Sequence, residues 1–119
     1  QDIDCLSICS PTPLHSNHLS KALENPYIEY IICEKPLVET KEDYEKIEYA
    51  LLNTNKKVII NYIRRFDPSF IQLKSILTQK EFGDIISFNG IFTKGLYHNG
   101  SHMLDLIELI IGDIKSIKV

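Results

Sequence analysis

The chain has 119 residues, enough for a compact domain with a hydrophobic core, and 44% of them are hydrophobic and 24% charged. Acidic and basic residues are mixed along the chain and give a net charge of -3, so no basic surface for nucleic acid or for an anionic membrane is indicated. No apolar run reaches the length of a membrane span, and no secretory signal peptide is recognisable.

The three cysteines, Cys5, Cys9 and Cys33, are an odd number without a Cys-x-x-Cys pair. This argues against a disulfide framework and against a zinc knuckle, and it favours buried, reduced thiols in a cytoplasmic protein. Because the chain begins at Gln1 and its only methionine is Met103, we expect a fragment of a longer protein.

Short strands and helices alternate in the first half of the chain. Residues 3–9, 27–33 and 58–63 are apolar runs rich in β-branched and aromatic residues, which predict buried strands. Residues 14–23 have apolar side chains at helical spacing, and a second helix is predicted to begin at Thr40, where an acidic residue three positions later completes a capping box. This alternation predicts a parallel sheet covered by helices on both faces.

The pattern changes near residues 66–68, where we place a domain junction. Asp67 followed by Pro68 predicts the start of another helix. Residues 85–93 are expected to form a longer strand, residues 101–111 a helix, and residues 114–119 the beginning of a further strand. The expected buried side of the helix after Pro68 consists of Phe70, Leu73, Ile76 and Leu77.

Two polar segments follow expected strands of the parallel sheet. They are residues 10–15 and the tripeptide Glu34-Lys35-Pro36. Ligands of open parallel sheets bind outside the carboxyl ends of the strands. A lysine directly after so apolar a strand is partly removed from water, which suits hydrogen bonding to a substrate hydroxyl, and Glu34 could orient it. Composition alone favours the alternative that Glu34 and Lys35 are an ordinary solvated pair at a strand end.

The segment 97–105 brings two histidines close to a carboxylate. On the helix predicted from residue 101, His102 and Asp105 lie one turn apart, and His98 lies just before its start. A histidine beside a carboxylate is a natural general base near neutral pH. The alternatives are a metal site formed by these three side chains, for which no strong zinc signature is present, and a structural role in capping or packing.

Arg64 and Arg65 follow the third expected strand. Paired guanidinium groups suit the recognition of phosphate or carboxylate. A solvated link between domains, held by salt bridges, is an equally good explanation of these two residues on their own.

Taken in order, these segments resemble the Gfo/Idh/MocA family of NAD(P)-dependent sugar and polyol oxidoreductases. That family typically has a Thr-Pro…His loop after its fourth strand, Glu-Lys-Pro after its fifth, an Arg-Arg-Phe-Asp-Pro link into the second domain, and a Gly-x-His-x-x-Asp helix. The resemblance covers nearly all of the chain. The matching residues are Ser10-Pro11 with His15, Glu34-Lys35-Pro36, Arg64-Arg65-Phe66-Asp67-Pro68 and Gly100-Ser101-His102-Met103-Leu104-Asp105.

The resemblance implies that Lys35 hydrogen-bonds the substrate hydroxyl near the nicotinamide, and that a strained or cis bond joins it to Pro36. It also implies that His102 is the acid–base group while hydride passes between a carbinol carbon and NAD or NADP. Residues expected to contact the substrate are Lys35, Arg65, Asn99, His102 and Asp105. Residues expected to line the nicotinamide-ribose end of the cofactor are Ser10, Pro11, His15 and Glu34. Lys35, Pro36 and Arg64 are also expected to bind the cofactor.

Two departures from the family pattern are visible. Many members have aspartate four residues before the histidine, where this chain has His98, so the base could be His102 alone or a pair of His98 and His102. The Gly-x-Gly-x-x-Gly turn that holds the pyrophosphate is absent from the sequence. We therefore expect the chain by itself to bind the cofactor poorly and to be inactive.

The fold class implied is α/β: the C-terminal half of a doubly wound, Rossmann-like parallel sheet, followed by the start of an α+β substrate or dimerisation domain. Residues 1–66 would be part of the nucleotide-binding domain and residues 67–119 part of the substrate domain. The expected function is hydride transfer between NAD(P) and a sugar, polyol or sugar-nucleotide carbinol in a cytoplasmic homo-oligomer, without a metal, nucleic-acid or membrane partner. The alternatives are a non-catalytic sugar- or nucleotide-binding relative and, third, a metal-dependent hydrolase that uses His98 and His102.

Overall fold

A computed structural model describes residues 3–118 of the chain. The chain divides into two compact units, Gln1–Asn61 and Tyr62–Val119, and each is described by itself. The assignment of residues 1–66 and 67–119 to two functional domains stays a prediction. Among the residues that the structure describes, no helix is both long enough and apolar enough to cross a membrane.

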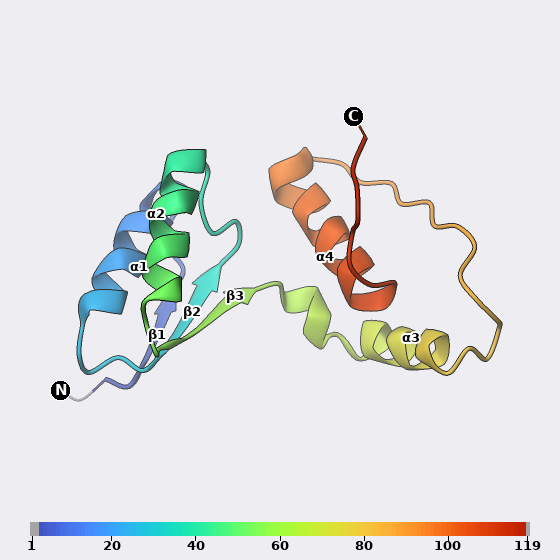
Figure 1. Cartoon of the computed structure of the whole chain (residues 1–119), viewed down its shortest axis with the longest axis horizontal. Coiled ribbons are helices and arrows are strands. Elements are labelled where there is room, and N and C mark those ends of the chain that lie inside the picture. The colour runs from blue at the N-terminus through green and yellow to red at the C-terminus, as the bar shows by residue number, and fades with distance from the viewer. Residues whose placement is uncertain (1–2, 119) are drawn as a thin grey trace. The chain divides into compact units, whose positions relative to one another are not determined.

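The first unit is a three-stranded parallel sheet with two long helices (Figure 1). Its strands run in the order β1-β2-β3, and each pair of neighbours is parallel. The predicted strand–helix–strand–helix–strand succession is therefore confirmed, with boundaries moved by a few residues. The elements are β1 (Cys5–Ile8), the short 3-10 helix η1 (Thr12–Leu14), α1 (His15–Glu24), β2 (Tyr30–Glu34), α2 (Lys41–Leu52) and β3 (Lys57–Asn61).

The core of this unit lies between the sheet and the two helices. Ile31 and Cys33 of the central strand are fully buried, as are Leu19 of α1 and Ile47 of α2. Successive residues of a strand point to opposite faces, so the side chains between them, such as Ile32, point away from the helices and are exposed. The apolar run of β2 thus provides one buried face and one bare face.

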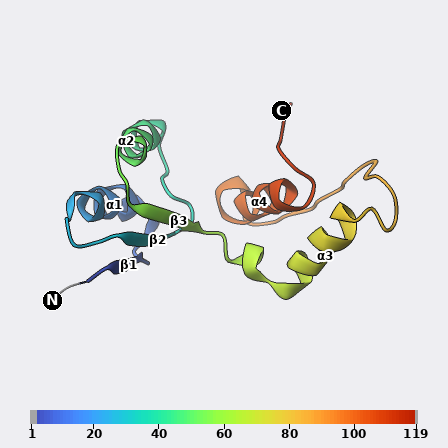
Figure 2. The ribbon, with the colours of Figure 1, turned by 60° about the horizontal axis from the view of Figure 1, so that its bottom comes forward.

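The expectation that helices cover both faces of the sheet was wrong for the described residues. Both α1 and α2 lie on the same side of the strands, as Figure 2 shows. Crossover connections between parallel strands are right-handed, so two successive crossovers in a sheet of order β1-β2-β3 place their helices on one face. Helices would cover the other face only if further strands were added beside β1, on the side away from β2.

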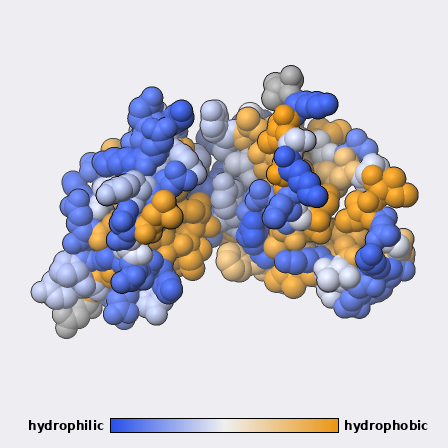
Figure 3. All heavy atoms as spheres, in the orientation of Figure 1, coloured by the Kyte–Doolittle hydropathy of each residue, from blue (hydrophilic) through white to orange (hydrophobic). Residues whose placement is uncertain are grey.

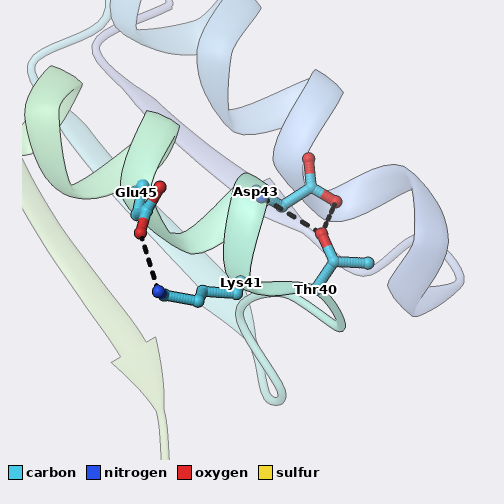
Figure 4. A network of polar contacts seen from close by, with 4 residues as sticks. All are labelled: Thr40, Lys41, Asp43 and Glu45. Atoms are coloured by element: carbon cyan, nitrogen blue, oxygen red, sulfur yellow. Dashed lines mark hydrogen bonds and ion pairs between the residues drawn. The ribbon is translucent and has the colours of Figure 1, made fainter.

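Local capping chemistry fixes the starts of two helices as the sequence predicted. At the N-terminus of α2, Thr40 Oγ1 accepts a hydrogen bond from the Asp43 amide at 3.1 Å and donates to the Asp43 carboxylate at 3.1 Å (Figure 4). At the start of α3 (Pro68–Thr78), Asp67 Oδ1 accepts from the Ser69 amide at 2.8 Å, with proline at the first helical position.

The second unit is helical. It contains the 3-10 turn η2 (Ile63–Phe66), α3, the π-helical turn η3 (Leu96–Gly100) and α4 (Ser101–Ile110). The predicted helix from residue 101 is confirmed. The strand predicted for residues 85–93 was wrong, because this segment is a long irregular connection between α3 and α4 (Figure 1). Ile86 is 97% exposed and Ile91 is 92% exposed.

The strands that were predicted for this unit but are not observed share one physical cause. An extended segment becomes a strand only when a neighbouring strand pairs with its amides and carbonyls, and the described residues of this unit contain no such neighbour. Residues 114–118 are irregular for the same reason, so the expected α+β character is not present here. Of the apolar side expected for α3, Phe70, Ile76 and Leu77 are half-buried, whereas Leu73 is 40% exposed. Figure 3 shows hydrophobic residues at the surface of this unit.

The three cysteines differ in burial. Cys33 is fully buried in the core, as expected, whereas Cys5 and Cys9 are exposed, so the expectation of three buried thiols was wrong. Cys5 belongs to the set of β1 side chains on the bare face of the sheet, and Cys9 follows the end of the strand. Burial, with smaller contributions from Glu34 and Cys9, raises the pKa of the Cys33 thiol to about 11.

Candidate active site

The carboxyl ends of the three parallel strands meet at one edge of the sheet in the first unit. This is the edge at which open parallel sheets bind ligands. Glu34 at the end of β2 is the register partner of Asn61 at the end of β3, and Asn61 Nδ2 donates a hydrogen bond to Glu34 Oε1 at 2.6 Å. The side chain of Glu34, predicted to line the cofactor site, is therefore held at this edge by a neighbouring strand.

Lys35 directly follows β2 and is half-buried. The bond between Lys35 and Pro36 is cis, which confirms the expectation of a strained or cis bond at this position. Because β2 ends at Glu34, Lys35 lies at the edge of the sheet. The tripeptide Glu34-Lys35-Pro36 thus lies at the carboxyl end of a parallel strand, the position from which the sequence predicted contacts with a ligand.

The loop after β1 lies beside this tripeptide. His15, the first residue of α1, is only 1% exposed. Its Nδ1 lies 2.8 Å from the carbonyl oxygen of Pro36, and its Nε2 lies 2.7 Å from that of Ser10. The structure therefore brings together Ser10, His15 and Pro36, three of the predicted cofactor-binding residues, while Pro11 in the same loop is exposed.

A second polar cluster lies inside the second unit, on and below α4. His102 and Asp105 are one helical turn apart and both buried, at 9% and 7% exposure. Arg65 Nε donates to Asp105 Oδ1 at 2.5 Å, and the ring of Tyr62 meets the His102 ring edge to face with centroids 5.9 Å apart. Predicted substrate residues Arg65, His102 and Asp105 thus form one cluster, with a half-buried Arg64 beside Arg65 on η2.

The electrostatics of this cluster centre on the Asp105 carboxylate. Oδ1 is bound by Arg65, whereas the buried Oδ2 has no hydrogen-bond partner among the described residues. Burial, followed by the negative charge of Asp105, raises the pKa of the Tyr62 phenol. The phenol therefore stays protonated at neutral pH and remains a hydrogen-bond donor beside the His102 ring.

The turn before α4 carries the remaining two predicted residues. His98 is exposed and Asn99 half-buried in the π-helical turn, and Ser101 Oγ donates to the His98 carbonyl at 2.9 Å. Gly100 is buried, and a Cβ there would lie 2.9 Å from the Phe92 ring, which would have to shift to admit a side chain. Within residues 3–118 no group of three or more metal-binding side chains is assembled.

Two contacts in these clusters were missed by reasoning from the sequence. Asn61 would have been found from its place at the end of a buried strand, since the ends of neighbouring parallel strands share an edge. Tyr62 follows Asn61 and gives no comparable signal, because its contact with His102 joins residues 40 positions apart in the chain. Lys35 belongs to the first unit and His102 to the second.

Comparison with known proteins shows to which family the chain is similar. Residues 1–62 match the family model described as an oxidoreductase family with an NAD-binding Rossmann fold, Gfo/Idh/MocA. An uncharacterised oxidoreductase of Bacillus subtilis is 33% identical over 82 residues, which cover 69% of this chain and 24% of that protein. Inositol 2-dehydrogenase of Pseudarthrobacter chlorophenolicus is 30% identical over 131 residues, 99% of this chain and 38% of that enzyme.

Solved structures agree with the sequence comparison. The crystal structure of apo scyllo-inositol dehydrogenase from Lactobacillus casei superposes with a TM-score of 0.65 at 30% identity, over 71% of this chain and 25% of that one. The chain thus spans well under half the length of the relatives it matches. The matched residues 1–62 contain the parallel sheet and the Glu34-Lys35-Pro36 edge, and the chain belongs to the Gfo/Idh/MocA family of oxidoreductases, in its NAD-binding Rossmann region.

Proposed function

We propose that the chain is part of an enzyme that transfers hydride between NAD(P) and a carbinol of a polyol or sugar, with a cyclitol such as inositol as the first substrate to test. The observation that carries the proposal is the position of Lys35, which directly follows the central parallel strand at its carboxyl end. The substrate class comes from relatives that are inositol dehydrogenases. Sugar nucleotides are the next class, because other carbinols present the same hydroxyl to Lys35.

The residues at the sheet edge fit one end of a dinucleotide. Ser10, Pro11, Glu34, Lys35 and Pro36 combine carbonyl, carboxylate and ammonium groups at the ligand-binding edge of a parallel sheet, which suits the ribose hydroxyls and the nicotinamide amide. No Gly-x-Gly-x-x-Gly turn is present in the sequence to hold the pyrophosphate. When bound, the cofactor supplies the carbon that accepts or gives the hydride.

Each polar group of the chain has a separate task in this proposal. Lys35 donates a hydrogen bond to the substrate hydroxyl oxygen and stabilises the charge that develops on it as the proton leaves. His102 accepts that proton, alone or with His98, and its buried ring is held by Tyr62. Arg65 and Asp105 fix α4 through their ion pair, and Arg64 and Asn99 contribute contacts to cofactor and substrate.

Further parts of the proposal concern the protein that contains this chain. The three strands are assigned to the C-terminal half of a doubly wound sheet, and residues 67–119 to the start of a substrate domain. The bare apolar face of the sheet, with Tyr30, Ile32 and Ile59 exposed, favours a chain that is stable only when further segments or further copies pack on it. A cytoplasmic homo-oligomer is the form we propose.

The test is turnover by the complete enzyme that carries this chain. Purified enzyme is assayed for reduction of NAD and of NADP with inositols, free sugars and sugar nucleotides. Lys35→Ala is expected to lower kcat by about a thousandfold, a typical contribution of a positioned proton-transfer group. Lys41→Ala is the matched control, because Lys41 is an exposed lysine on α2 that pairs with Glu45 at 3.4 Å (Figure 4). Unchanged turnover in Lys35→Ala, with the control also unchanged, would remove Lys35 from the mechanism.

A non-catalytic relative of the same fold is the second candidate. His98 favours it, because many family members have aspartate at this place and a catalytic pair would be altered. Calorimetry and turnover assays separate the two candidates. If the protein binds a ligand but turns over no tested carbinol with either cofactor, the result supports the binding module and contradicts the enzyme.

A further inference from the structure

The His15 ring spans the two loops of the ligand-binding edge. Its two nitrogens lie 2.7 Å and 2.8 Å from the main-chain carbonyl oxygens of Ser10 and Pro36, which follow β1 and β2 respectively. The ring is 1% exposed, so neither nitrogen is placed to reach a ligand in solvent. A contact with the cofactor, the role implied for His15 by the family pattern, therefore does not use this side chain as the structure has it.

The two partners of the ring determine its chemistry. A carbonyl oxygen can only accept a hydrogen bond, so each ring nitrogen must donate one for both contacts to be hydrogen bonds. A neutral imidazole carries one N–H, and its other nitrogen would present a lone pair to a carbonyl oxygen at less than 3 Å. Only the doubly protonated ring satisfies both distances.

We propose that His15 is a positioning residue whose doubly protonated ring clamps the loop after β1 to the loop that carries Lys35. The clamp acts on Lys35 through its neighbour, because Pro36 holds the ring and follows Lys35 directly. Pinning Ser10 and Pro36 to one rigid ring at the start of α1 fixes the distance between the two loops. The clamp itself does not depend on the proposed function, and only its effect on turnover rests on that function.

Two further hydrogen bonds hold the start of α1 on either side of the ring. The next residue, Ser16, donates to Asp43 Oδ1 at 2.7 Å and so ties the same end of α1 to the N-terminus of α2. His18, one turn along α1, is held by Ser10 through a contact of 3.0 Å between Nδ1 and Oγ. The titratable groups on the elements around the ring are Cys9 after β1, His18 on α1, Glu34 and Lys35 at the end of β2, and Asp43 on α2.

Nuclear magnetic resonance on the complete enzyme that carries this chain tests the clamp without any assay of activity. With ¹⁵N and ¹³C labelling, both His15 ring nitrogens are expected to have the shifts of protonated nitrogen, with hydrogen-bond couplings to the carbonyl carbons of Ser10 and Pro36. A His15 ring nitrogen with the shift of unprotonated nitrogen at neutral pH, in the folded enzyme, would overturn the proposal.

A pair of substitutions separates the clamp from a general packing role. His15→Gln can reach one carbonyl at most and should raise amide hydrogen exchange at Leu37, the residue after Pro36, by about tenfold. His18→Gln is the control: the hydrogen bond of His18 is to Ser10 in the loop after β1, so exchange at Leu37 should change less than about twofold. Equal effects of the two substitutions at Leu37 contradict the clamp.

The effect on turnover distinguishes this proposal from the proposed function. In the complete enzyme, His15→Gln should lower kcat by about tenfold or more and change the KM for the substrate much less, because misplacing Lys35 affects the reacting geometry. An unchanged kcat with an active parent enzyme overturns the positioning role. If the parent enzyme turns over no carbinol while the resonances show the clamp, the proposed function fails and the clamp stands.

Discussion

Replacing Arg65 with leucine tests the account of the cluster on α4. Asp105 is 7% exposed, and its Oδ1 depends on Arg65 Nε at 2.5 Å, while Oδ2 has no hydrogen-bond partner among the described residues. Removing one partner of a fully buried ion pair costs about 3–5 kcal/mol, because the other charge is left without compensation. Since the Arg65 side chain is 38% exposed, water can reach part of the gap, and we expect about 2–3 kcal/mol of lost unfolding free energy.

The measurement is urea unfolding of the complete enzyme that carries this chain, followed by far-ultraviolet circular dichroism. Two companion variants complete the design. Asp105→Asn removes the charge itself, so Arg65→Leu combined with Asp105→Asn should be more stable than Arg65→Leu alone, by about 1–2 kcal/mol. Asp84→Asn is the control, because Asp84 pairs with Lys80 at the surface with 79% exposure, and such a pair contributes at most about 1 kcal/mol. A loss for Arg65→Leu no larger than that for Asp84→Asn would refute the reasoning.

Four further predictions concern the first unit. Thr40→Ala removes the cap of α2 and should cost about 1 kcal/mol in urea unfolding, with Lys41→Ala near zero as the control. Hydrogen bonds from Ser16 and then Thr40 lower the pKa of Asp43, so the stability it contributes is present above the usual pKa of about 3.9 and is lost as the pH falls through the lower folded value, which an acid titration of stability should show. Cys33 should resist a thiol reagent at neutral pH in the folded chain while the other two cysteines react, because burial keeps its thiol protonated; equal labelling of all three would contradict this. Lys56→Met should lower the midpoint of thermal unfolding by removing about 1–2 kcal/mol, since its ammonium donates to three main-chain carbonyls where α1 ends; an unchanged midpoint would show that these bonds contribute nothing net.

Much of the first unit could be predicted from local patterns. The apolar runs and the helical spacing predicted the parallel sheet, and the caps at Thr40 and Asp67 were readable because an N-cap needs only residues within a few positions. The cis bond before Pro36 followed from the family pattern around Lys35. In each case the information lies in a short stretch of chain.

What could not be predicted depends on partners far apart in the sequence. The run of residues 85–93 has the composition of a strand, but no neighbouring strand is present among the described residues of its unit to pair with it. The ring of His15 bridges carbonyls 5 and 21 residues away, and its burial was not visible from its place in a polar loop. Arg65 and Asp105 are 40 residues apart in the chain. From the sequence alone, Arg65 could therefore be assigned equally well to a ligand contact or to a salt bridge.

The central claim is that the enzyme containing this chain passes hydride between a carbinol carbon and a nicotinamide. The most direct measurement uses inositol deuterated at the reacting carbon, with mass spectrometry of the reduced cofactor after turnover. The account predicts one deuterium in each reduced nicotinamide from the parent enzyme and about a thousandfold slower labelling in Lys35→Ala. No deuterium in the cofactor from any tested carbinol, by an enzyme that is folded and binds NAD or NADP, would contradict the account.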